Sequence, residues 1–299
     1  MKNYLSLIKF SHTIFAMPFA LVGFTLGIYE SKTSVDWHIL LCIILCMIFA
    51  RSAAMAFNRY LDRDIDVKNP RTVVREIPAG IISPTAALSF VIINCLLFIA
   101  TTWFINPLCF FLSPVALLVI LGYSYTKRFT FLCHFVLGLG LALAPLGAYL
   151  AVTGHFDILP IMYSAVVLLW VAGFDIIYAL QDEEFDKSLN LNSVPVKLGK
   201  KGALQLSNIL HLASAIVLFM AVWTLNTEAV SDVIINGAQD ENTFGWLHWI
   251  GYLAFISLLF YQHTLVKVND LSKVNMAFFT TNGIASVIYG SFFIIDYLF

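Results

Sequence analysis

Charged residues are scarce in this sequence of 299 residues. Asp, Glu, Lys and Arg make up 12% of the chain, against about 25% in soluble domains, and 60% of the residues are hydrophobic. This composition excludes a soluble globular protein and predicts an integral membrane protein. Metal-binding cysteine patterns are also absent. The five cysteines follow no zinc-ligand spacing with histidine and are interpreted as small apolar packing residues.

Nine apolar stretches are long enough, or nearly so, to cross a bilayer. They predict an all-α, polytopic membrane protein, with nine transmembrane helices in a bundle around a central cavity. At about 20 residues each, these spans leave no room for a soluble domain, so residues 1–299 are expected to form a single membrane domain. One re-entrant hairpin over 84–122 fits the third and fourth stretches equally well. The predicted spans are 10–29, 38–57, 84–104, 107–122, 134–152, 159–180, 205–225, 245–261 and 276–297.

Basic residues fall almost entirely on one side of this topology. The N-terminus and the loops after even-numbered spans carry 15 of the 17 Lys and Arg residues. Only Lys32 lies on the other side, and Arg51 lies within a span. By the positive-inside rule the basic side faces the cytoplasm, which predicts an inner-membrane protein whose cavity opens to the cytoplasmic side.

Two acidic clusters stand out, each following an even-numbered span. The first is Asn58, Asp62 and Asp66, and the second is Asp182 and Asp186, 120 residues further along. Helical residues four positions apart differ by about 40° around the axis, so each set is expected to project from one helix face. Packed carboxylates repel unless a divalent cation joins them, and an all-oxygen ligand set suits Mg²⁺ with a phosphorylated ligand. These five residues are the predicted metal ligands.

A solvated helix end is the alternative explanation of such clusters. Asp64, Glu183 and Glu184 are assigned to it, since they are not needed for the aligned faces. The aligned acids are interpreted as functional because basic residues lie nearby, as the outer oxygens of a diphosphate would require. The candidates for this role are Arg59, Arg63, Lys68, Arg71, Arg75, Lys127 and Arg128.

Two charged residues lie deeper, inside predicted spans. A guanidinium facing lipid would cost about 3 kcal/mol or more, so Arg51 is expected to face the bundle. It lies nearly on the face of Asn58 and is predicted to bind phosphate or an acceptor carboxylate, or else to hold helices together in a buried ion pair. Asp175 is expected to extend the site or to pair with Arg51 or a tyrosine. His12 and His134 are given no role.

The motifs around these residues resemble the UbiA superfamily of intramembrane aromatic prenyltransferases. The stretch that begins at Asn58 is similar to the first signature of the family, and the stretch that begins at Tyr178 is similar to the second. Between them, Tyr123 to Arg128 resembles a Tyr-x-x-x-Lys-Arg segment of the family. The resemblance covers the whole chain. The matching stretches are 58–66, 69–72, 75–80, 122–128, 178–187 and 193–195.

This resemblance implies a Mg²⁺-dependent transfer of a polyprenyl group from a polyprenyl diphosphate to an aromatic acceptor. The two acidic clusters would hold Mg²⁺ and the diphosphate. The basic residues that would neutralise its charge or position the acceptor are Arg71, Arg75, Lys127 and Arg128. Aromatic faces such as those of Tyr123, Tyr125 and Tyr178 would stabilise an allylic cation. The predicted catalytic residues are Asp62, Asp66, Asp182, Asp186 and Arg128.

Two positions depart from the family pattern. Arg59 stands where an Asp often follows the first Asn, and Asn190 stands where Gly is common after the second motif. Neither departure removes a predicted metal ligand. Asn tolerates the left-handed backbone conformation that Gly usually supplies, so the turn is expected to survive.

The acceptor is the open question. The segment 11–20 is most similar to 4-hydroxybenzoate polyprenyltransferases of ubiquinone-type pathways, and a hydroxynaphthoate for menaquinone is the alternative. The acceptor carboxylate would bind Arg128 or Arg51. A secondary transporter with intramembrane carboxylates is the alternative from another class, but its acids should lie near the membrane midplane rather than at helix ends. The expected partners are the two substrates and the lipid bilayer, with no nucleic acid.

Overall fold

The computed structural model describes residues 2–7, 15–236 and 244–299, and the secondary structure in these ranges is helical, without strands. The expected all-α fold is therefore confirmed for the described residues. The elements are α1 (Lys2–Leu7), α2 (Met17–Ser31), α3 (Trp37–Leu61), α4 (Arg63–Asp66), α5 (Pro84–Trp103), α6 (Pro107–Thr126), α7 (Cys133–Thr153), α8 (Ile158–Ala179), η2 (Leu180–Asp182), α9 (Glu183–Ser188), α10 (Val194–Asn236), α11 (Leu247–Leu265), η3 (Met276–Thr281) and α12 (Asn282–Leu298).

Seven described helical segments are long and apolar enough to cross a membrane, which makes the chain an integral, multi-pass membrane protein. They contain α3, α5, α6, α7, α8, α10 and α12. The remaining two predicted spans correspond to α2, a helix of 15 residues, and α11, a helix of 19 residues. Residues 10–14 of the first predicted span, which include His12, lie outside the described residues.

Helix α5 and helix α6 are two separate helices, each long and apolar enough to cross a membrane. Helix α5 ends at Trp103, and α6 begins at Pro107 after the N-cap residue Asn106. The side chain of Asn106 accepts a hydrogen bond from the backbone N–H of Cys109. Proline is well suited to the first helical position because it has no N–H to leave unpaired, so this short sequence specifies a helix start.

Helix α10 is longer than the sequence predicts. It begins at Val194 rather than at residue 205, and it bends at Gly199, whose φ of 67° is left-handed. The helix also continues to Asn236, beyond the predicted span 205–225, so residues 226–236 are helical and not part of a loop between two spans. The polar residues of this stretch suggested a loop, yet the helix continues through them. Residues 237–243 lie outside the described part of the chain.

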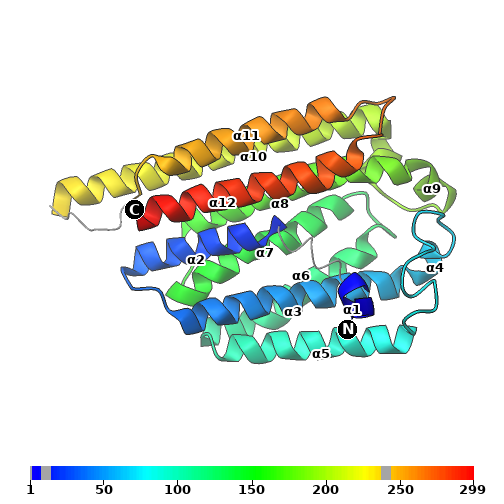
Figure 1. Cartoon of the computed structure of the whole chain (residues 1–299), viewed down its shortest axis with the longest axis horizontal. Helices are drawn as coiled ribbons and strands as arrows, with labels where there is room; N and C mark the ends of the chain where they lie inside the picture. Colours follow the sequence, from blue (N-terminus) through cyan, green and yellow to red (C-terminus); the bar gives the residue numbers. More distant parts are fainter. Residues whose placement is uncertain (1, 8–14, 237–243) are drawn as a thin grey trace.

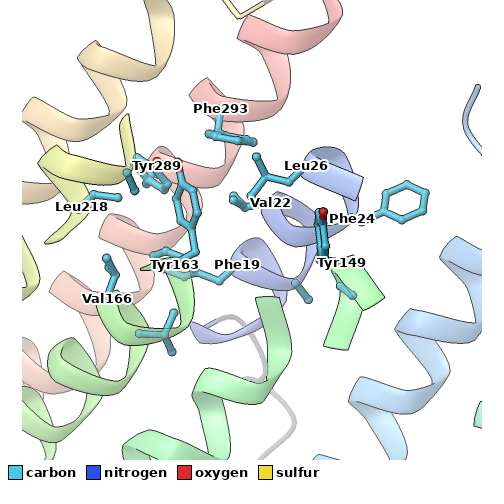
Figure 2. Packing of buried hydrophobic residues seen from close by; sticks show 14 of the residues in the cluster. Phe19, Val22, Phe24, Leu26, Tyr149, Tyr163, Val166, Leu218, Tyr289 and Phe293 are labelled. Atoms are coloured by element: carbon cyan, nitrogen blue, oxygen red, sulfur yellow. Dashed lines mark hydrogen bonds between the residues drawn. The ribbon is translucent and has the colours of Figure 1, made fainter. Parts of the chain in front are cut away.

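Aromatic side chains form the centre of the core (Figure 2). Phe19 of α2, Tyr163 of α8 and Tyr289 of α12 are fully buried, and the two tyrosine hydroxyls are 2.8 Å apart in a hydrogen bond. Helix α2 lies very close to α7, because a Cβ on Gly23 would come within 2.0 Å of the carbonyl oxygen of Pro145. Small residues at such crossings let membrane helices approach closely.

The two helices that carry the acidic motifs end at the same end of the bundle. The short helices α4 and α9, which follow α3 and α8, lie together there, while the C-terminus lies at the opposite end (Figure 1). The fold therefore brings the two motifs to one region, although 120 residues separate them along the chain.

Candidate active site

Both motifs contain a break in the helix at an aspartate. Helix α3 ends at Leu61, and Asp62 has φ −87° and ψ 5°; the turn η2 ends at Asp182, with φ −103° and ψ 4°. A short helix follows each break and carries Asp66 or Asp186. The expectation that each set lies on the face of one continuous helix is wrong, because ψ near 0° redirects the chain at both positions.

Asp62 is buried and is held from two sides. The amide of Asn58 donates to its carboxylate at 3.1 Å, and Arg128, from the end of α6, donates to it at 2.9 Å. The same guanidinium also donates to the carbonyl oxygens of Leu61 and Ser124. Arg128 therefore joins the helix break of the first motif to the loop after α6.

The second acid of each motif also has a basic partner. Arg75 donates from one nitrogen to both carboxylate oxygens of Asp66, at 2.7 and 2.9 Å. Lys127 lies 3.9 Å from the carboxylate of Asp186. Asp66 and Asp186 are both buried, so each depends on its partner for charge compensation.

The loop after α4 reaches the second motif. Arg71 forms an ion pair with the carboxylate of Asp182 and donates to the hydroxyl of Tyr178 at 2.8 Å. Its guanidinium also lies 5.3 Å from the centre of the Tyr178 ring. Burial acts against the charge of Arg71, but Asp182 and Tyr178 outweigh it and raise the pKa of the guanidinium above its ordinary value. Asn69, which the sequence did not single out, lies 3.5 Å from Asp182.

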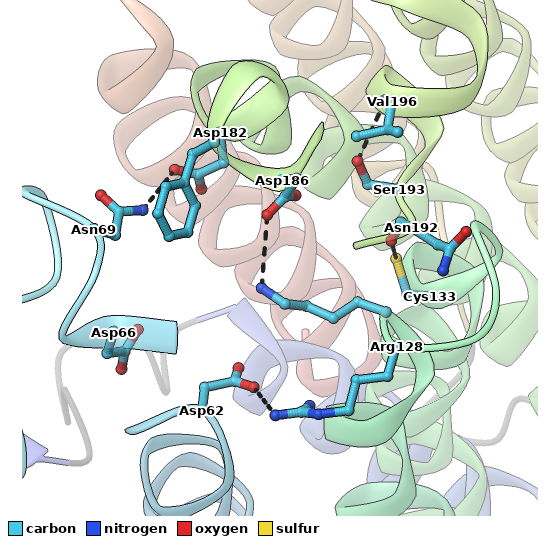
Figure 3. Close-up of polar contacts among 12 residues, drawn as sticks. Asp62, Asp66, Asn69, Arg128, Cys133, Asp182, Asp186, Asn192, Ser193 and Val196 are labelled. Carbon is cyan, nitrogen blue, oxygen red and sulfur yellow. Dashed lines mark hydrogen bonds and ion pairs between the residues drawn. The ribbon is translucent and has the colours of Figure 1, made fainter. Parts of the chain in front are cut away.

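Four carboxylates thus lie beside four cations, and Figure 3 shows the acids on neighbouring elements. Within the described residues, no three acidic, His or Cys side chains come together closely enough to hold a metal ion. The sequence predicted one joint ligand set, whereas the structure pairs each carboxylate with an Arg or Lys. The donor chemistry still suits Mg²⁺, because all the donors are oxygens of Asp or Asn side chains. The pairs are Asp62–Arg128, Asp66–Arg75, Asp182–Arg71 and Asp186–Lys127.

An apolar cavity of about 350 Å³ lies between α3, α5, α6 and α7. Arg51 of α3 and Tyr123 of α6 are among its lining residues. Both lie in the C-terminal halves of their helices, which point toward the acidic motifs. Arg51 faces this cavity and not lipid, as expected. Its Nε is buried and has no hydrogen-bond partner among the described residues.

Asp175 pairs with a residue that the sequence left without a role. Its carboxylate lies 2.6 Å from Nδ1 of His134, and not in an ion pair with Arg51, which was one of the partners expected for it. A lone histidine at a predicted helix start gives no signal of such a contact. Glu183 also differs from expectation, since it is buried beside Lys187 rather than solvated, whereas Asp64 and Glu184 are exposed as expected.

A model of the UbiA prenyltransferase family matches residues 16–284. The chain belongs to this family. The expected enzyme class, a prenyltransferase, is thereby confirmed at the level of the family, and the secondary-transporter alternative is wrong. The left-handed turn expected at Asn190 is confirmed as well, with φ 54°.

Named relatives and solved structures agree with this assignment. A 4-hydroxybenzoate octaprenyltransferase of Aliivibrio fischeri strain MJ11 is 29% identical over 256 residues, which cover 85% of this chain and 82% of the relative. The apo structure of a UbiA homologue from Aeropyrum pernix K1 matches with a TM-score of 0.78 at 28% identity, over 95% of this chain and 98% of that one. A UbiA homologue from Archaeoglobus fulgidus bound to DMAPP and Mg²⁺ shares the fold, with a TM-score of 0.71 at 22% identity and 98% coverage of each chain.

Proposed function

We propose that this protein transfers a prenyl group from a polyprenyl diphosphate to a small aromatic acid, with 4-hydroxybenzoate as the acceptor. The observation that carries the proposal is the pairing of four motif carboxylates with four Arg or Lys side chains. Carboxylates suit a cation, and the adjacent guanidinium and ammonium groups suit the outer oxygens of a diphosphate. The relative from Aliivibrio fischeri, a 4-hydroxybenzoate octaprenyltransferase at 29% identity, supports the acceptor.

Asp62, Asp66, Asp182 and Asp186 would hold Mg²⁺ together with Asn58. When bound, Mg²⁺ would supply positive charge to a departing diphosphate and so lower the barrier to breaking the C–O bond. Arg71, Arg75, Lys127 and Arg128 would bind the same leaving group from the loops after α4 and α6. Positively charged groups placed before the reaction stabilise the charge that develops as the bond breaks.

The geometry favours Arg51 over Arg128 as the partner of the acceptor carboxylate. Arg128 already donates to Ser124, Leu61 and Asp62, whereas the Nε of Arg51 has no hydrogen-bond partner among the described residues. The apolar walls of the adjoining cavity suit a prenyl chain and exclude water from an allylic cation. The ring of Tyr123 lines the same cavity and offers its face to such a cation.

The proposed arrangement is one membrane domain that crosses an inner membrane nine times, with α2 and α11 as the two crossings beyond the seven apolar segments. The distribution of Lys and Arg supports a cavity mouth on the cytoplasmic side, where the acidic motifs meet. A prenyl diphosphate would then enter from the bilayer and the aromatic acid from the cytoplasm.

The test is an acceptor panel with the purified protein, Mg²⁺ and a polyprenyl diphosphate. Mass spectrometry of the products would report which acceptor gains a prenyl group, and the panel should include 4-hydroxybenzoate and hydroxynaphthoates. We expect a prenylated 4-hydroxybenzoate and stoichiometric diphosphate release. If only a hydroxynaphthoate gains a prenyl group, the acceptor is a naphthoate and not 4-hydroxybenzoate. If no aromatic acid gains a prenyl group, the proposal is refuted.

A further inference from the structure

A polar pair lies deeper in the bundle than the acidic motifs. Asp175 lies on α8 and precedes Asp182, the last residue of η2, by about two helical turns, or about 10 Å along the axis. Its neighbours Phe174 and Ile176 are buried, but the Asp175 side chain keeps 21% of its surface exposed. The carboxylate therefore faces an opening in the bundle and not the packed core.

His134 holds one oxygen of this carboxylate. Its Nε2 accepts a hydrogen bond from the backbone N–H of Val194 at 3.3 Å, so a neutral ring carries its proton on Nδ1. That Nδ1–H donates to Asp175 at 2.6 Å. The other carboxylate oxygen has no hydrogen bond within the described part of the chain. One oxygen is thus fixed by His134, and the second is free to accept a proton.

The pair belongs to the same region as the proposed acceptor site. The hydroxyl of Tyr123 is close enough to interact electrostatically with Asp62, Arg51 and Asp175. Tyr123 and Arg51 both line the apolar cavity. On α7, residues 137, 141 and 144 line it too, and His134 lies one turn before them on that face. Asp175 therefore lies near Tyr123, which lines the cavity together with Arg51.

We infer that Asp175 accepts the hydroxyl proton of a phenolic acid acceptor during prenyl transfer, and that His134 is the residue that positions it. This inference rests on the proposed function. A negative charge beside the hydroxyl group raises the electron density of the ring, which is what attack on an allylic cation requires. Such proton acceptors typically contribute about 10²–10⁴-fold to the rate.

The step balances in atoms and electrons. The C–O bond of the prenyl diphosphate breaks, and its electron pair leaves with the diphosphate. A ring carbon next to the hydroxyl-bearing carbon forms the new C–C bond, while the hydroxyl proton passes to Asp175 and leaves a neutral dienone. The ring carbon then loses its hydrogen as a proton, the oxygen regains one, and the aromatic ring is restored. One proton is released for each diphosphate.

The first test compares Asp175→Asn with the wild-type protein, using 4-hydroxybenzoate and a fluorinated 4-hydroxybenzoate whose hydroxyl is already ionised at the assay pH. We expect kcat with 4-hydroxybenzoate to fall by roughly 10²-fold or more, with KM for the prenyl diphosphate within about twofold. The loss should be much smaller with the fluorinated acceptor, which has no hydroxyl proton to give up. An unchanged kcat, or an equal loss with both acceptors, would overturn the inference.

Asp296→Asn is the matched control, because Asp296 forms another buried pair with a histidine, His248, at the far end of the bundle. Asp296→Asn should lower thermal stability and leave the ratio of the kcat values for the two acceptors unchanged. If Asp175→Asn does not fold, His134→Ala and His134→Asn replace it. The Asn side chain can still donate a hydrogen bond to Asp175, so kcat should be higher in His134→Asn than in His134→Ala. Equal kcat values for these two variants would overturn the inference. Failure of the wild-type protein to prenylate any phenolic acid would instead refute the proposed function.

Discussion

Arg128 donates to the carboxylate of Asp62 at 2.9 Å and, from the same nitrogen, to the carbonyl oxygen of Leu61 at 3.1 Å. Its other terminal nitrogen donates to the carbonyl oxygen of Ser124 at 3.0 Å. One guanidinium therefore stabilises both the helix break at Asp62 and the end of α6. Such a contact depends on a planar group with several N–H donors.

The first prediction concerns this geometry. Arg128→Lys should lower turnover by roughly 10²-fold, because an ammonium cannot serve the same three acceptors in one plane. Diphosphate release by the purified protein measures the effect. Arg63→Lys is the matched control, because Arg63 contacts Tyr60 and the exposed Asp64 but none of the four motif carboxylates. Turnover close to wild type in Arg128→Lys would show that only the charge matters.

The metal assignment predicts a loss of Mg²⁺-dependent turnover in Asp62→Asn and in Asp182→Asn. Each change keeps the side-chain shape and removes the negative charge, so the protein should still fold while its response to Mg²⁺ disappears. Asp64→Asn serves as the control, because the Asp64 side chain is 82% exposed. A Mg²⁺ titration of diphosphate release checks all three variants. Either site variant with a normal titration would contradict the assignment.

The hydroxyl of Tyr178 gives a smaller and more specific prediction. It accepts a hydrogen bond from Arg71. Tyr178→Phe removes this bond and should make the position of the Arg71 guanidinium less favourable by about 1 kcal/mol. We expect KM for the prenyl diphosphate to rise roughly fivefold while kcat changes little. Tyr178→Leu should have a larger effect, because it also removes the ring face beside Arg71. Equal KM values for the Phe variant and the wild type would argue against a role for the hydroxyl.

Much of the fold follows from local sequence signals. Long apolar runs predict the membrane helices, and the sequence Asn106-Pro107 marks a helix start through an N-cap side chain and a proline. The same reasoning failed at residues 226–236. Polar residues at the end of an apolar run are compatible with either a loop or a continued helix, and composition alone does not separate the two.

The candidate site was predictable in its residues but not in its contacts. Spacing singled out Asp62 and Asp182, yet the break in each helix arises from the backbone at those very positions. The choice of partners depends on how distant elements meet, as in the pairing of Asp175 with His134 across 41 residues. Burial of Glu183 is a similar case, because it arises from packing of α9, although its partner Lys187 lies one turn away on the same helix.

Close packing of α2 on α7 predicts a stability effect at Gly23. Gly23→Ala would place a methyl group against the backbone of Pro145, which can move only if the two helices separate. We expect a loss of about 1–3 kcal/mol, seen as a lower midpoint of thermal unfolding in detergent. Gly147→Ala on α7 is the control, because a Cβ there meets no atom within 4 Å. An unaltered midpoint for Gly23→Ala would contradict the close crossing.

The turn at Asn190 connects backbone conformation to the position of Asp186. Asn190 has φ 54°, its N–H donates to the carbonyl oxygen of Lys187, and the N–H of Leu191 donates to the carbonyl oxygen of Asp186. These are the two hydrogen bonds of a Schellman motif, which ends α9 with a left-handed residue.

Asn190→Gly should therefore be tolerated, because glycine adopts this conformation without strain. Asn190→Val should cost about 1–2 kcal/mol, since a side chain branched at Cβ is poorly accommodated there. Because the turn fixes the last part of α9, the Val variant should also raise KM for the prenyl diphosphate through a displaced Asp186. Thermal unfolding and diphosphate kinetics of the two variants test this link. A Val variant that is less stable but has a normal KM would separate the turn from the site.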